Sequence, residues 1–150
     1  MRPDKALFTT GAITVRKALL SDHQSLMEVD EYAQTDRKRA VYLKSCLAAD
    51  ECLVGEIGTD VFGFVVLNYS FFNFGFVPLI MVAEPFRRQG LGLRLLNEAA
   101  ERCESSKLFI SANASNKAAQ ALFAKAGFVQ SGSIENLNDS EPELIYFKNV

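Results

Sequence analysis

The sequence contains few residues that bind metals or form disulfides. It has one histidine, His23, and three cysteines, Cys46, Cys52 and Cys103, without a C-x-x-C pair. These residues lack the close pairs of ligands that a structural zinc quartet usually has, so we expect no metal site. An odd number of separated thiols also argues against a disulfide framework. It favours a reducing compartment, with the cysteines as small buried hydrophobic residues.

The chain also lacks an excess of positive charge. Sixteen lysines and arginines are balanced by eighteen aspartates and glutamates, which gives a net charge of −2. Nucleic acid-binding modules need clustered cations to neutralise phosphates, so we expect no nucleic acid partner. Hydrophobic residues make up 49% of the chain. That share is enough to bury a core and excludes an intrinsically disordered chain.

Nothing in the sequence divides it into parts. It has no internal repeat, low-complexity run or flexible linker, so we expect residues 1–150 to form one domain. Residues 1–5 lack the apolar core of a signal peptide, and we therefore expect a cytoplasmic protein. Residues 61–83 carry no charge, but polar residues near 68–73 favour two buried strands joined by a turn over a membrane helix.

Hydrophobic periodicity predicts an α/β domain with a mixed sheet. A first helix begins after Ser21-Asp22 and continues to Tyr32, with His23 solvated in its first turn. Further helices are expected at 35–49, 90–103 and 116–126. Strands are expected at 13–17, 52–57, 61–69, 74–82, 108–112, 129–134 and 143–147. Strands followed by an alternation of strand and helix indicate this fold class.

The helix expected at 90–103 has an unusual start. No serine, threonine, aspartate or asparagine lies between Val82 and Gly92 to cap it. Arg87 and Arg88 instead bring positive charge to a helix end that already carries partial positive charge. An anionic ligand would turn this unfavourable arrangement into a favourable one.

The glycines of this segment allow close approach to such a ligand. Gly90 and Gly92 have no Cβ atoms, so N–H groups from Gln89 to Gly92 can converge on phosphate oxygens. The segment lacks the Gly-Lys-Ser/Thr of a Walker A loop. It also lacks the third glycine of a dinucleotide fingerprint, because Leu95 stands there. A nucleotide-binding module and a plain glycine turn with solvated arginines remain alternatives.

Two motifs resemble the GNAT superfamily of N-acetyltransferases. Arg87-Arg88-Gln89-Gly90-Leu91-Gly92 is similar to its R-x-x-G-x-G pyrophosphate loop, and residues 116–128 are similar to its N-x-x-A-x-x-L-[YF]-x-K-x-G-F helix and exit. The resemblance is strong over 79–128. It implies a mixed sheet of about seven strands flanked by about four helices, with the strands 74–82 and 108–112 splayed apart.

The resemblance further implies acetyl-CoA as the co-substrate and an amine of a small molecule or protein as the acceptor. The acetyl group would pass directly to the amine in a ternary complex. A backbone N–H near Ile80 or Met81 would stabilise the developing oxyanion. The residues implied to bind coenzyme A are Ile80, Val82, Arg87, Arg88, Gln89, Gly90, Leu91, Gly92, Asn116 and Phe123.

The catalytic residues are not identified by the sequence. Phe123 stands where many relatives carry a tyrosine that protonates the departing thiolate. Residues 74–81 contain no ionisable side chain, whereas some relatives carry a glutamate there as general base. These departures leave open a rival interpretation, a catalytically weak or inactive coenzyme A-binding sensor or regulatory module.

The second motif also has structural signals. We expect Ser115 to cap its helix, Gly127 to end it in the left-handed conformation, and Phe128 to contact Phe123. Because Ser115 already caps the helix in this interpretation, no structural role is left for Asn116. That agrees with its implied contact with coenzyme A.

The acceptor side is expected at the acidic segment 135–143, which turn-forming residues predict to be a loop. The resemblance places this loop beside the acceptor site, so Glu141 and Glu143 are expected to bind a cationic amine. A solvated acidic loop is the alternative. Residues 30–32, including Tyr32, would form the opposite wall. The aromatic loop 69–73 would cover the site or a second subunit, which leaves a homodimer open.

Overall fold

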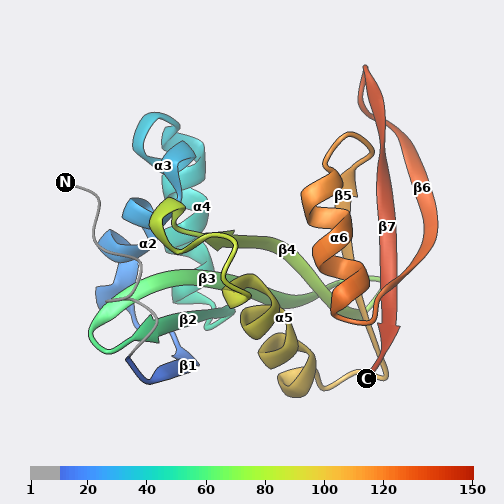
Figure 1. Ribbon diagram of the computed structural model, residues 1–150. Coiled ribbons are helices and arrows are strands. Elements are labelled where there is room, and N and C mark those ends of the chain that lie inside the picture. Colours follow the sequence, from blue (N-terminus) through green and yellow to red (C-terminus); the bar gives the residue numbers. More distant parts are fainter. Residues whose placement is uncertain (1–10) are drawn as a thin grey trace.

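The computed structural model describes residues 11–150, so the segment used for the signal-peptide argument lies outside the described residues. A seven-stranded sheet with the order β1-β2-β3-β4-β5-β7-β6 crosses the molecule (Figure 1). All neighbouring strands are antiparallel except β4 and β5, which are parallel. The mixed α/β sheet expected from the sequence is therefore confirmed.

The strands are β1 Ile13–Lys17, β2 Cys52–Ile57, β3 Asp60–Phe71, β4 Phe74–Val82, β5 Lys107–Asn113, β6 Val129–Asn138 and β7 Glu141–Asn149. The helices are α2 His23–Val29, α3 Glu31–Thr35, α4 Arg37–Ala48, α5 Leu91–Arg102 and α6 Lys117–Lys125. Two 3₁₀ turns, η1 Leu20–Asp22 and η2 Glu84–Phe86, precede α2 and α5.

Helices cover both faces of the sheet. The alternation of side chains along β3 sends Phe64 and Val66 toward α2 and α4, and Val65 toward α5. Leu95 and Leu96 of α5 are fully buried on that second face. The sheet is therefore apolar on both sides where helices cover it.

The uncharged run 61–83 forms the β3–β4 hairpin, as expected. Its turn is shorter than predicted, because Phe72 and Asn73 both take positive φ angles of 53° and 66°. A two-residue turn of this kind matches the twist of paired strands, so β3 continues to Phe71. No helix among the described residues is long and apolar enough to cross a membrane.

Two other segments differ from the prediction. The first expected helix is divided at Asp30, whose carboxylate accepts a hydrogen bond from the Tyr32 N–H and caps the separate helix α3. The expected acidic loop 135–143 is a paired β-hairpin, with its turn at Asp139 and Ser140. The Asn138 side chain accepts hydrogen bonds from both the N–H and the hydroxyl of Ser140, which tightens that turn.

The histidine and the cysteines contribute to packing. His23 is half-buried, with Nε2 3.2 Å from the carbonyl oxygen of Ala40, so the prediction of a solvated histidine is wrong. This contact ties α2 to α4. Cys46 and Cys52 are buried as expected, and burial raises the pKa of Cys52 to about 12. Cys103 is only half-buried.

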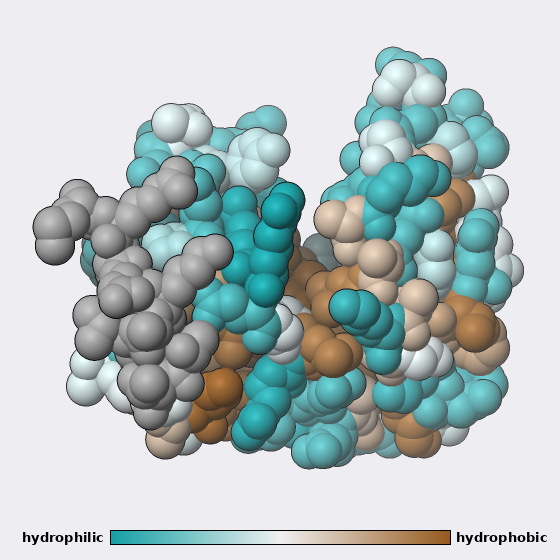
Figure 2. Space-filling model, viewed as in Figure 1, coloured by the Kyte–Doolittle hydropathy of each residue, from teal (hydrophilic) through white to brown (hydrophobic). Residues whose placement is uncertain are grey.

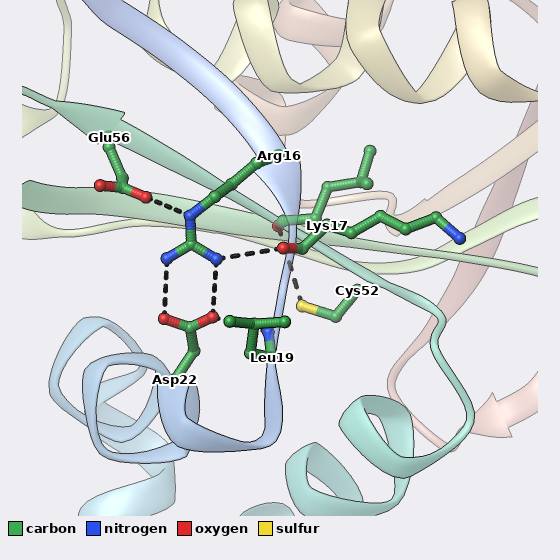
Figure 3. Close-up of polar contacts among 7 residues, drawn as sticks. Arg16, Lys17, Leu19, Asp22, Cys52 and Glu56 are labelled. Carbon is green, nitrogen blue, oxygen red and sulfur yellow. Dashed lines mark hydrogen bonds and ion pairs between the residues drawn. The ribbon is translucent and has the colours of Figure 1, made fainter.

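An arginine network attaches the α2–α4 layer to the sheet edge (Figure 3). Arg16 of β1 donates two hydrogen bonds to the Asp22 carboxylate, at 2.8 and 2.9 Å. Its Nε also donates to Glu56 of β2. The guanidinium holds the pKa of Asp22 below its usual range. One side chain thereby joins two strands to the turn that starts α2.

Candidate active site

The strands β4 and β5 pair over a short stretch only. Gly75–Val77 lie beside Leu108–Ile110, and the pairing ends there. The register between β3 and β4 shifts at Leu67, which stands opposite both Val77 and Pro78. Such a bulge bends the strand, and Pro78 has no N–H to continue the ladder to β5. The two strands therefore diverge, which confirms the splayed pair implied by the resemblance to the GNAT superfamily.

Beyond the bulge, alternate residues of β4 direct their backbone groups into this opening. The Ala83 N–H donates to the Phe62 carbonyl at 2.8 Å. In the antiparallel pairing of β3 and β4, this bond fixes which residues of β4 have their N–H and C=O groups directed to β3 and which have them directed away. In this arrangement Met81 bonds to β3, while the N–H and C=O groups of Ile80 and Val82 point away from it. The edge of β4 thus offers backbone groups to an extended ligand.

A deep cleft lies at the divergence (Figure 2). The helices α2–α4 and the segment after β4 stand on one side of it, and α6 with β5–β7 on the other (Figures 1 and 2). Hydrophobic residues form its floor; polar residues border it on the side of α2–α4, and both polar and apolar residues border it on the side of α6. An apolar hollow bordered by polar groups is typical of a site for a small molecule.

The start of α5 lies beside this cleft and, within the described chain, has no side-chain cap, as expected. Gly90 occupies the cap position with a left-handed φ of 77°. Arg88 also has a positive φ, 62°, and its side chain is exposed. Arg87 donates from Nε to the carbonyl of Val82 at 2.8 Å, which braces the loop against β4.

The other loop residues have distinct surroundings. Gln89 donates from Nε2 to the Pro85 carbonyl at 3.3 Å, while its buried Oε1 has no partner among the described residues. Leu91 is buried in the core, so only its backbone is available at the loop. A Cβ atom at Gly92 would lie 3.4 Å from the Leu122 side chain, which places Gly92 at the contact between α5 and α6.

Asn116, not Ser115, caps α6, so the predicted cap is wrong. Asn116 Oδ1 accepts a hydrogen bond from the Ala119 N–H at 3.1 Å. Ser115 instead donates from its N–H and Oγ to the Glu141 carboxylate, at 2.6 and 2.8 Å. A carboxylate is the stronger acceptor, and it engages both donors of Ser115. Asparagine caps helices as well as serine does, a signal that the sequence already carried.

The end of α6 follows the prediction. Gly127 is left-handed with φ 89°, and the Phe128 N–H donates to the Phe123 carbonyl at 2.9 Å. The Gly127 N–H donates to Ala124 at 3.0 Å, which completes a Schellman motif. The rings of Phe123 and Phe128 lie 6.4 Å apart, as the predicted contact requires.

Phe123 itself is a core residue. It is 2% exposed, and its ring packs edge-on against Tyr146 at 5.3 Å. The side chain that the resemblance directs at coenzyme A therefore presents almost no surface. The Tyr146 hydroxyl donates to Gln120 Oε1 at 3.4 Å. The structure thus points this hydroxyl at α6.

The two predicted acidic residues have different roles. Glu141 holds the β6–β7 hairpin to the start of α6 through Ser115, and these hydrogen bonds lower its pKa. Glu143 accepts a hydrogen bond from Ser111 Oγ at 2.8 Å. Ile110 packs with α6, so its neighbour Ser111 points to the opposite face of the sheet, and Glu143 lies there with it. Ser111 is one residue beyond Ile110, the last residue of β5 that pairs with β4.

Across the cleft, Tyr32 on α3 is 67% exposed. Its neighbour Asp30, expected in the same wall, is fully buried and unavailable to a ligand. Tyr32 belongs to α3 and Glu143 to β7, and these two elements stand apart on opposite sides of the molecule (Figure 1).

Comparisons with known proteins agree with this geometry. Residues 16–128 match the model of the acetyltransferase (GNAT) family. An L-2,4-diaminobutyric acid acetyltransferase from Shouchella clausii is 29% identical over 130 residues, which cover 81% of this chain and 72% of that protein. A GNAT acetyltransferase from Bacillus cereus has a TM-score of 0.86 at 30% identity, over 93% of this chain and 98% of that one.

A more distant structure shares the fold. The diaminobutyrate acetyltransferase from Paenibacillus lautus, solved with L-2,4-diaminobutyric acid and coenzyme A, has a TM-score of 0.70 at 18% identity, over 91% of this chain and 95% of that one. The family match covers the splayed strands, the loop before α5 and the whole of α6. The chain belongs to the GNAT family of acetyltransferases, whose acetyl donor is acetyl-CoA.

Proposed function

We propose that this acetyltransferase binds acetyl-CoA in the opening between β4 and β5 and transfers the acetyl group directly to an amine. The observation that carries the proposal is the divergence of these strands beside the uncapped start of α5. The diphosphate would bind the N–H groups from Gln89 to Gly92. The pantetheine arm would extend β4 along Ile80 and Val82.

The residues fit this ligand in charge and in space. The exposed Arg88 and the N–H groups at the start of α5 supply positive charge for a diphosphate. A Cβ atom at Gly90 would meet nothing within 4 Å among the described residues, so the loop is open there. Asn116 uses its oxygen as a cap, which leaves its Nδ2 group as a donor to the ligand.

The chemistry requires attack of the amine nitrogen on the thioester carbonyl carbon. As the C–N bond forms, negative charge develops on the carbonyl oxygen, and the N–H of Ile80 is the donor that faces it. Met81, the alternative donor, is directed to β3. The acceptor attacks as the free amine, so its ammonium form first gives one proton to water. Collapse of the intermediate breaks the C–S bond; the nitrogen gives a second proton to water, and the departing thiolate takes one from water.

Glu143 is the carboxylate that we assign to the cationic amine. Ser111 uses one of its oxygens and holds the side chain in place, and the other oxygen remains for an ammonium group. Glu141 is the weaker candidate for this role, because each of its oxygens already accepts a hydrogen bond from Ser115. The acceptor named for the Shouchella relative, a diamino acid, is consistent with a cationic acceptor.

Thiol release from acetyl-CoA across a panel of primary amines tests the proposal. We expect turnover with at least one amine, an N-acetylated product by mass spectrometry, and intersecting initial-rate lines for a ternary complex. The rival function is a coenzyme A-binding sensor, which is favoured by the phenylalanine at position 123, where many relatives carry the tyrosine acid, and by the lack of an ionisable residue in 74–81. Tight coenzyme A binding without turnover of any amine would support that rival.

A further inference from the structure

A carboxylate is fully buried where α2, α3 and α4 meet. Asp30 is 0% exposed; its Oδ1 accepts from the Tyr32 N–H at 3.1 Å and its Oδ2 from Arg39 Nη1 at 2.7 Å. A buried carboxylate is costly unless it is paired with a cation. Asp30 therefore fixes the position of the Arg39 guanidinium.

Arg39 is also held by an aromatic ring. Its Cζ atom lies 5.6 Å from the centre of the Tyr32 ring, within the range of a cation–π contact. Its side chain is 30% exposed, and only Nη1 has a side-chain acceptor among the described residues. The N–H groups on Nε and Nη2 form one edge of the planar guanidinium and have no acceptor among the described residues, so they remain available as an oriented pair of donors.

The helices that carry Arg39 and Tyr32 border the cleft. The helices α3 and α4 form one side of the cleft, opposite the β6–β7 hairpin that carries Glu143 (Figures 1 and 2). Neutralisation of Asp30 uses a single N–H group of Arg39 and leaves the others without a role in that contact. A guanidinium fixed by a buried carboxylate and stacked on a ring is pre-organised to bind a carboxylate with two parallel hydrogen bonds.

We infer that Arg39 binds a carboxylate of the acceptor, so that the substrate class is amino acids rather than simple amines. The inference rests on the proposed function, which places the acceptor between the two walls. The ammonium group to be acetylated would lie toward Glu143, and the carboxylate would lie toward Arg39 and Tyr32. Opposite charges on opposite walls then fix the orientation of the acceptor.

Matched pairs of acceptors that differ only in the carboxylate provide the test. Diaminobutyric acid is compared with diaminopropane, ornithine with putrescine, and lysine with cadaverine. One charge-assisted bidentate contact is expected to raise kcat/KM for the better-fitting amino acid about 10- to 100-fold over its diamine. Arg39→Lys keeps the charge that Asp30 needs but loses the fork, and it should bring that ratio close to 1 by lowering kcat/KM for the amino acid.

The control is Arg37→Ala, in the same turn of α4, which removes an exposed cation and should leave the ratio unchanged. A ratio near 1 in the wild type, or a wild-type ratio in a folded Arg39→Lys variant, overturns the inference. If no amine is turned over, the proposed function fails, and calorimetry of the same pairs on the coenzyme A-loaded protein decides the inference. Preferred binding of the amino acids that is lost in Arg39→Lys supports it, and equal or absent binding overturns it.

Discussion

The two sides of the cleft are built from different kinds of groups. On the proposed donor side, from Arg87 to Gly92, the groups offered to a ligand are mainly backbone N–H groups and the charges beside them. On the proposed acceptor side, Glu143 and Arg39 are side chains held by Ser111 and Asp30. Ser111 lies far from Glu143 in the sequence, and Asp30 stands at an unexpected helix break. A site made from one continuous segment can be recognised by spacing, whereas an assembled site requires the fold.

The largest effect is expected from Arg88→Ala. Loss of one charge-assisted contact to the diphosphate should weaken coenzyme A binding by roughly 1.5–3 kcal/mol, or about 10- to 150-fold. Arg94→Ala is the matched control, because it removes an equally exposed cation about one turn along α5. Titration calorimetry with coenzyme A measures both. An equal loss in the two variants would mean that only the general charge of α5 matters.

Asp22→Asn should weaken the attachment of the α2–α4 layer, which forms the proposed acceptor side, to the edge of the sheet. It removes the charge that Arg16 binds through two hydrogen bonds, at a cost of roughly 1–3 kcal/mol in the free energy of unfolding at pH 7. Arg16 lowers the pKa of the folded carboxyl. The stabilisation is therefore complete above the unfolded value, about 3.9, and is lost as the pH falls through the folded pKa.

Urea unfolding across this pH range provides the measurement. The difference in stability between wild type and Asp22→Asn should shrink as the pH falls below about 4, while coenzyme A affinity at pH 7 stays unchanged. A difference that does not depend on pH would show that the contact is one of packing and not of charge.

Substitution of the two glutamates of the β6–β7 hairpin distinguishes a role in acceptor binding from a structural role. Glu143→Gln should raise the acceptor KM about 10-fold with an unchanged KM for acetyl-CoA, because one charged contact to the ammonium group is lost. Glu141→Gln should leave both KM values unchanged, since its partner is Ser115. The effect of Glu143→Gln should weaken at high salt. A larger change in acceptor KM from Glu141→Gln would reverse the assignment.

Alanine substitutions at the two glycines of the donor loop should have different effects on stability. Alanine at Gly90 must adopt a left-handed φ of 77°, which costs about 1–2 kcal/mol of stability or shifts the loop. Alanine at Gly92 adds a Cβ at an ordinary contact distance from Leu122 and favours the helix by up to about 1 kcal/mol. Thermal unfolding with and without coenzyme A compares them. Equal effects of the two changes would show that the Gly90 backbone is not constrained.

The smallest effect is expected from Tyr146→Phe. The hydroxyl is directed to Gln120 and the ring packs on Phe123, so it is not placed to protonate a thiolate. The variant should keep near-normal kcat in the thiol-release assay. A loss greater than about 10²-fold, in a folded protein that still binds acetyl-CoA, would identify Tyr146 as the missing acid.

The sequence predicted most of the fold, because periodic hydrophobic segments and glycine signals are local. The Schellman end at Gly127 and the uncapped start at Gly90 were both predicted in this way. The predictions that were wrong concern residues whose hydrogen-bonding partner is supplied by a segment distant in the sequence. Ser115 is a good helix cap by type, but Glu141 of another strand takes its donors.

The acceptor site was less predictable for the same reason. Turn-forming residues in 135–143 indicated a loop, yet pairing with β7 extends β6 through Asn138. Arg39 carries no motif, and its orientation depends on the burial of Asp30, which only the packing of three helices creates.

The most direct test of the account is a crystal structure of the protein with coenzyme A. The account predicts diphosphate oxygens about 3 Å from the N–H groups between Gln89 and Gly92, with the pantetheine arm beside Ile80 and Val82. It also predicts that Phe123 remains buried. A diphosphate bound away from the start of α5, or an arm outside the β4–β5 opening, would contradict it.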